Sequence, residues 1–83
     1  MARLALFGRL AEAGWREPRM IALPPEVDTV AALRAWLAAR EPQLAVALAR
    51  PGVRAVVDDM IVGEQAAIDD SSDLAFIPPV SGG

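Results

Sequence analysis

The sequence predicts an α+β fold in which a small mixed sheet packs on one main helix. Three observations predict it. Short alternating apolar segments occur near both ends of the chain, one central segment repeats its apolar residues at helical spacing, and Gly, Pro or paired Asp separate the segments. The chain has 83 residues, of which 54% are hydrophobic. This is enough for one core and too short for two.

The first two strands are expected close to the N-terminus. Residues 3–7 alternate, which places Leu4 and Leu6 on one face and Phe7 on the other. Residues 19–23 form a second β-rich run that ends at a Pro-Pro pair. Because only eleven residues separate the two runs, an antiparallel hairpin with a wide loop is the simplest connection.

The main helix is expected to begin after Thr29, whose hydroxyl is typical of an N-cap. Apolar residues then recur at helical spacing, while Arg34 lies away from that stripe. Pro42 ends the helix at about residue 41, and residues 43–50 continue helically.

Three further strands are expected at residues 54–58, 60–62 and 73–77. In the last of them Phe76 and Ile77 point to opposite faces. A Pro-Pro pair then ends the sheet, because proline cannot donate to a strand ladder. The order of two strands, a helix and short strands is that of the β-grasp, or ubiquitin-like, arrangement.

The composition excludes several kinds of chemistry. There are no cysteines and no histidines, and all eight basic residues are arginine. The chain therefore has no thiolate nucleophile, no Cys or His zinc site and no lysine amine for Schiff-base chemistry. We expect a protein that is not an enzyme on its own, with no metal and no bound cofactor.

Charge is spread unevenly along the chain. Residues 58–83 hold six acids and no base, which disfavours nucleic-acid binding there. We expect these acids to lie beside the tail and to meet a basic partner surface; the alternative is a solvated rim. No stretch has the ~20 apolar residues of a membrane span, and the N-terminal apolar run is too short for a signal peptide. A cytoplasmic protein without membrane attachment is expected.

The C-terminal residues are the strongest functional candidate. We expect one domain over residues 1–77, followed by a flexible tail over 78–83 that ends in Gly82 and Gly83. Two glycines allow close backbone approach by another protein, and the prolines favour an extended conformation. At ~3.3 Å per residue, such a tail reaches about 20 Å.

A family resemblance supports this interpretation. Residues 73–83, Asp-Leu-Ala-Phe-Ile-Pro-Pro-Val-Ser-Gly-Gly, closely resemble the end of the small, sulfur-carrier subunit of molybdopterin synthase (the MoaD family). Further similarity in residues 4–10, 28–33 and 56–62 extends the likeness over nearly the whole chain. Two departures concern turn geometry: Ser71 stands where the family has a turn glycine, and Asp58 where asparagine is common.

The resemblance implies a mechanism and partners. An E1-like enzyme would adenylate the Gly83 carboxylate with ATP, and a sulfur donor would convert it to a thiocarboxylate. The tail would then enter the large synthase subunit, in a heterotetramer, and give its sulfur to cyclic pyranopterin monophosphate. The residues that would bind the partner are an apolar patch and the tail itself: Phe7, Ile61, Ile77, Pro78, Pro79, Val80 and Ser81.

Other interpretations of the function stay open. The same carrier chemistry could serve thiamin thiazole or tRNA thiolation. The chain could instead be a protein modifier, although without lysine it could not build lysine-linked polymers on itself. A purely structural module would leave the tail unexplained. For the patch, the alternative is that Phe7 packs beneath the loop 8–18.

Overall fold

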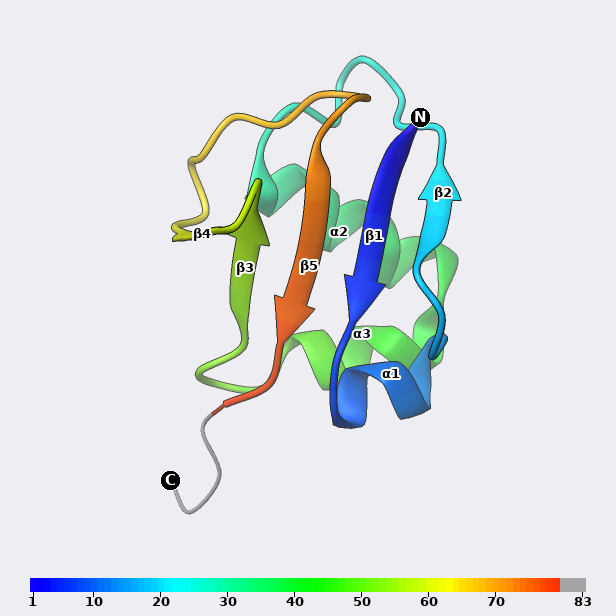
Figure 1. Cartoon of the computed structure of the whole chain (residues 1–83). Helices are drawn as coiled ribbons and strands as arrows, with labels where there is room; N and C mark the ends of the chain where they lie inside the picture. Colours follow the sequence, from blue (N-terminus) through cyan, green and yellow to red (C-terminus); the bar gives the residue numbers. More distant parts are fainter. Residues whose placement is uncertain (80–83) are drawn as a thin grey trace.

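The computed structural model describes residues 1–79, which form one mixed sheet covered on one face by helices (Figure 1). The sheet order is β2-β1-β5-β3-β4. The strands are β1 (Ala2–Leu6), β2 (Arg19–Ile21), β3 (Arg54–Val57), β4 (Met60–Val62) and β5 (Asp73–Ile77). The helices are α1 (Arg9–Ala13), α2 (Val30–Arg40) and α3 (Pro42–Leu48). Helix α2 crosses behind the sheet, and α1 and α3 lie toward the end where β1 and β5 finish.

The last strand, β5, lies in the middle of the sheet. It runs parallel to β1 and antiparallel to β3. The predicted hairpin is confirmed, because β1 and β2 pair antiparallel. The predicted second strand is too long, since it ends at Ile21. The N–H of Leu23 donates to Oδ1 of Asp70 at 2.8 Å and so does not extend β2.

The β3–β4 connection explains one departure from the family pattern. Asp58 and Asp59 both adopt positive φ, 48° and 69°, so β3 ends at Val57, one residue earlier than expected. Asparagine and aspartate tolerate this conformation, and two such residues make the mirror-image turn that suits a tight hairpin. The Asp58 carboxylate also accepts a hydrogen bond from the N–H of Asp73 at 3.0 Å.

The turn before β5 forms without a glycine. Ser72 donates its N–H to the carbonyl of Asp69 at 3.1 Å, and the N–H and hydroxyl of Ser71 both donate to Oδ1 of Asp69. These hydrogen bonds from Ser71 hold the pKa of Asp69 below its usual value. Ser71 does not need a positive φ here, so its side chain replaces the glycine without strain.

The main helix is built as predicted. Thr29 caps α2, and its hydroxyl accepts a hydrogen bond from the N–H of Ala32 at 3.1 Å. The helix ends at Arg40, and Pro42 begins α3 in the first helical position. The two helices cover the core side of the sheet.

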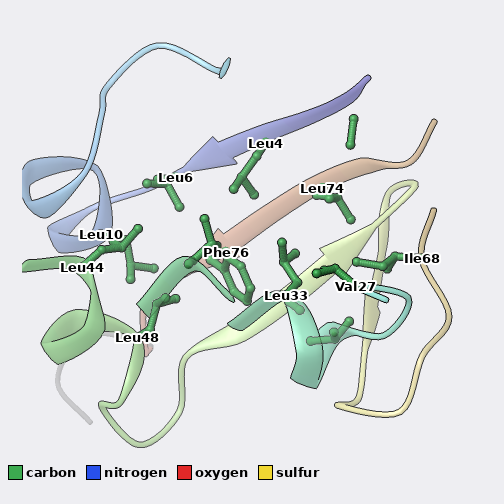
Figure 2. Packing of buried hydrophobic residues seen from close by; sticks show 14 of the residues in the cluster. Leu4, Leu6, Leu10, Val27, Leu33, Leu44, Leu48, Ile68, Leu74 and Phe76 are labelled. Atoms are coloured by element: carbon green, nitrogen blue, oxygen red, sulfur yellow. The ribbon is translucent and has the colours of Figure 1, made fainter. Parts of the chain in front are cut away.

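The core confirms the predicted strand faces. Leu4 and Leu6 of β1 and Leu74 and Phe76 of β5 point into one apolar cluster, where side chains of all three helices meet them (Figure 2). Trp15 closes one side of the cluster and donates its Nε1–H to the carbonyl of Leu4 at 3.2 Å. Within residues 1–79, no helix is both long and apolar enough to cross a membrane.

Candidate functional site

The root of the C-terminal tail lies at the end of the central strand. Strand β5 ends at Ile77, and the N–H of Phe7 donates to the carbonyl of Phe76 at 3.2 Å. Pro78 and Pro79 follow, and neither has an N–H with which to continue a ladder. The sequence therefore stops the sheet at a defined residue.

Two glycines pack against these prolines from opposite sides. Gly8, in the β1–α1 connection, has φ +56°, and a Cβ placed on it would lie 2.9 Å from Cγ of Pro78. Gly52, in the α3–β3 connection, has φ +88°, and a Cβ there would lie 3.0 Å from Cβ of Pro79. Both positions thus combine a backbone conformation that favours glycine with close packing: a Cβ on Gly8 would force Pro78 to shift, and one on Gly52 would make an unusually tight contact with Pro79. The glycines hold the root of the tail in place.

Phe76 anchors the strand that leads to the tail. Its side chain is 1% exposed, and the guanidinium of Arg34 lies over its ring at 5.2 Å. Arg34 also binds Glu64 through two hydrogen bonds, of 3.0 and 2.7 Å, and donates to the carbonyl of Leu48 at 3.1 Å. The hydrogen bond from Arg34 holds the pKa of Glu64 below its usual value. Sequence reasoning left Arg34 outside the apolar stripe and missed this role.

The face of the sheet opposite the helices carries the predicted docking patch. The strand register places one row of apolar residues across it: Ala5, Ala75, Val56 and Ile61. Phe7 and Ile77 line a shallow depression of about 390 Å³ on the same face, nearer the tail. Phe7 is 51% exposed and Ile61 60% exposed, so the 8–18 loop does not cover Phe7. The structure brings the three predicted residues to one face, and their binding to a partner stays a prediction.

The acidic residues do not lie beside the tail root, so that expectation is wrong. Asp58 and Asp73 are hydrogen-bonded at the start of β5, and Asp70 binds the N-terminal ammonium at 3.2 Å near the start of β1. Asp73 and Ile77 are four residue steps apart along β5, a length of roughly 13 Å. The acids are close to the tail in sequence but not in space, because β5 runs from one end of the sheet to the other between them.

Three exposed arginines instead lie on the strand and loops that meet at the root of the tail. Arg54 is paired with Ile77 across β3 and β5, Arg9 directly follows Gly8, and Arg50 precedes the turn that contains Gly52. All three arginines are exposed. This end of the molecule is therefore suited to an acidic partner surface.

The C-terminal end of the chain is not part of the described structure. Pro78 and Pro79 are described, whereas Val80, Ser81, Gly82 and Gly83 lie outside residues 1–79. Within residues 1–79, no group of three or more acidic side chains is placed to hold a metal ion. Sequence reasoning missed Gly8 and Gly52 because it interpreted each only as the boundary of an element. Their position in the two loops nearest the tail could have indicated that they pack against its root.

Comparison with known proteins places the chain in a family. A model of the ThiS family matches residues 4–83. The chain belongs to the ThiS family. The match covers the β-grasp body and the C-terminal tail, and it agrees with the resemblance to sulfur-carrier proteins seen in the sequence. No curated protein sequence matches the chain significantly.

Solved structures support the ubiquitin-like fold of this ThiS-family chain. It is similar to the small archaeal modifier protein 1 of Haloferax volcanii, with 20% identity, a TM-score of 0.76 and coverage of 95% of this chain and 97% of the other. It is also similar to the Haloferax volcanii HVO 2177 protein, with 24% identity, a TM-score of 0.80 and coverage of 99% and 85%. The small archaeal modifier protein 1 of Methanosarcina acetivorans is similar as well, with 21% identity, a TM-score of 0.75 and coverage of 99% of this chain and 95% of the other.

These findings fix the type of protein. The chain has the fold of ubiquitin-like sulfur carriers and modifiers and does not belong to a family of catalytic enzymes. At these identities the structural likeness shows the fold alone. The acceptor of the carried group is therefore a matter for proposal.

Proposed function

We propose that the chain is the sulfur-carrier subunit of a molybdopterin synthase, with the Gly83 carboxylate as its working group. The observation that carries this proposal is the construction of the tail root. The central strand ends at two prolines packed against two positive-φ glycines, beside an exposed apolar face. A tail placed in this way suits insertion into a partner docked on that face.

The side-chain inventory supports the same site. With no cysteine in the sequence, carried sulfur has to be bound at the C-terminus. An E1-like partner would join the Gly83 carboxylate to the AMP part of ATP and release pyrophosphate. Sulfide sulfur from a donor would then attack the carbonyl carbon, and AMP would leave, which gives a thiocarboxylate. In the large subunit the thiocarboxylate sulfur would form a bond to cyclic pyranopterin monophosphate. Water would then hydrolyse the bond between this sulfur and the Gly83 carbonyl carbon, which leaves the sulfur on the product and a carboxylate on Gly83. ATP thus serves the activating partner, and the carrier holds no cofactor.

The docking geometry gives the partners' expected chemistry. The large subunit would cover Phe7, Ile61 and Ile77 with an apolar surface in a heterotetramer. Because exposed arginines lie on the strand and loops that meet at the tail root, we expect acidic residues at the mouth of the channel that receives the tail. This replaces the basic surface that the sequence suggested for the same position.

Intact mass spectrometry tests the chemistry. After incubation with an E1-like enzyme, ATP and a sulfur donor, the mass of the chain should increase by the difference between one sulfur atom and one oxygen atom. A chain that lacks Gly83 is the matched control and should show no change. No mass change in the parent, with an activating enzyme proven active on another carrier, would refute the carrier role.

Co-purification tests the acceptor. A molybdopterin synthase large subunit should bind the chain as a heterotetramer, and Phe7→Asp should abolish binding. Binding to a thiazole synthase or to a tRNA-thiolating enzyme instead would assign another acceptor to the same carrier chemistry.

A modifier role is the second candidate, favoured by the likeness to two proteins described as small archaeal modifiers. In that role the activated Gly83 carboxylate would form an isopeptide bond with a lysine of another protein. Incubation in a cell extract with ATP should then give covalent conjugates that survive thiol reduction. The carrier role predicts free thiocarboxylate and no such conjugates.

A further inference from the structure

A second exposed surface lies between strand β2 and helix α2, away from the tail. β2 is the terminal strand of the sheet, and Met20 in its centre is 56% exposed. Beside this strand, a groove of about 390 Å³ is lined by β2, by Trp15 and by the C-terminal half of α2. Two strands, β2 and β1, separate this edge from the strand that carries the tail.

The register shows which backbone groups the free edge offers. Arg3 and Phe7 direct their N–H groups to β5. By the alternation of a strand, Ala2 and Leu4 therefore direct theirs to β2, where they are paired with Ile21 and Arg19. Met20, between those two residues, turns its N–H and carbonyl outward. This is the arrangement that accepts an added strand.

The groove is both apolar and cationic. Ile21 and Trp36 pack against the core cluster and form its apolar floor. The guanidinium of Arg19 lies 4.4 Å from the centre of the Trp15 ring, and that of Arg40 lies 4.7 Å from the centre of the Trp36 ring. Stacking on an indole holds each guanidinium in place while its edge stays open to a carboxylate.

The charges at the groove are not balanced within the body of the protein. Among residues 1–79, neither Arg19 nor Arg40 forms an ion pair. Of the residues that the structure describes, Glu41 is the one acid that lines the groove, and it accepts a hydrogen bond from the side chain of Gln43 at 3.0 Å. Two held cations beside an open strand edge complement an extended segment that carries carboxylates.

We propose that the β2–α2 groove binds an acidic, apolar peptide segment of another protein as an added strand beside β2. The segment hydrogen-bonds to Met20, places alternate apolar side chains over Ile21 and Trp36, and directs acidic residues to Arg19 and Arg40. Because the site lies apart from the tail root and the docking patch, it can hold the protein while its C-terminus reacts elsewhere. The proposal does not depend on the proposed carrier function.

The test uses the full chain, labelled with ¹⁵N, and a capped peptide of four alternating valine and isoleucine residues flanked by two glutamates on each side. Saturable amide shifts are expected at residues 19–22, together with a shift of the Trp36 indole and weaker binding at high salt. R19E and R40E should each weaken affinity about three- to tenfold, whereas V46E, at an exposed position on α3 that does not line the groove, should leave it unchanged.

Two further measurements separate strand addition from simple charge attraction. A peptide N-methylated at alternate residues keeps its charges but should bind about tenfold more weakly, because it cannot complete the ladder. Met20→Pro should do the same from the protein side, provided that its amide spectrum shows a folded chain. Equal binding of a lysine-flanked peptide, shifts centred on residues 60–62, or no saturable shift would each overturn the proposal.

Discussion

Replacing Gly8 by alanine should destabilise the protein by distorting the root of the tail. The backbone at this position has φ +56° and ψ −131°, which a residue with a Cβ adopts at a cost of about 1–3 kcal/mol. The new Cβ would also lie 2.9 Å from Cγ of Pro78, so the proline has to shift. Together we expect a loss of about 2–3 kcal/mol in the free energy of unfolding, which for a chain of this size lowers Tm by about 10–20 °C.

Urea unfolding measures this loss, and the chain offers a matched control. Nothing lies within 4 Å of a Cβ placed on Gly63, so Gly63→Ala should change stability by less than about 0.5 kcal/mol. Adding Pro78→Ala to Gly8→Ala should restore about 1 kcal/mol, because it removes the contact and leaves the backbone strain. Equal stability of Gly8→Ala and Gly63→Ala would refute the close packing of Gly8 against the tail root.

Three other changes test separate parts of the structure. The N–H of Leu23 and then the N-terminal ammonium hold the pKa of Asp70 below its usual value. The stability that this carboxylate adds is therefore present above the unfolded-state pKa and is lost as the pH falls through the lower folded-state pKa. Asp70→Asn should therefore lower Tm at neutral pH and match the parent in strong acid; a constant difference in calorimetry at every pH would contradict this. Phe7→Asp should remove binding to the large subunit in titration calorimetry with little loss of stability. Val46→Asp, at a 75% exposed position on α3, should leave that binding intact. Loss of binding in both variants would count against a localised patch. Thr29→Ala should lower the free energy of unfolding in urea by about 1 kcal/mol through loss of the cap, while Thr29→Ser should keep most of the parent's stability. Equal losses in the two variants would show that the hydroxyl does not act as the cap.

The parts of the fold that depend on local rules were predictable from the sequence. Alternation placed Leu4 and Phe76 on the core side, and both are buried in one cluster. A hydroxyl before an apolar periodic run placed the start of α2 at Thr29, which the cap hydrogen bond confirms. In each case the decisive physics acts within a few residues, so composition and spacing were sufficient.

The arrangement of charge was not predictable, because it depends on long-range pairing. The expected strands did not show that β5 would lie between β1 and β3, so the direction in which it carries the chain was unknown. As a result the acids before β5 were placed beside the tail, whereas Arg54 lies there through its pairing with Ile77. The positive φ of Asp58 was also missed, because aspartate tolerates that conformation without requiring it.

The central position of β5 has a mechanical consequence for the C-terminal tail of the proposed carrier. A terminal strand is held by one ladder, whereas β5 is held by ladders to both β1 and β3 and by the buried ring of Phe76. To peel it away would break both ladders and expose that ring, which alone costs about 3 kcal/mol. Binding energy gained at the tail therefore goes into positioning the C-terminus and not into unravelling the body. Gly8 and Gly52 place this fixed point at Pro78 and Pro79, so the length of chain available to a partner begins there.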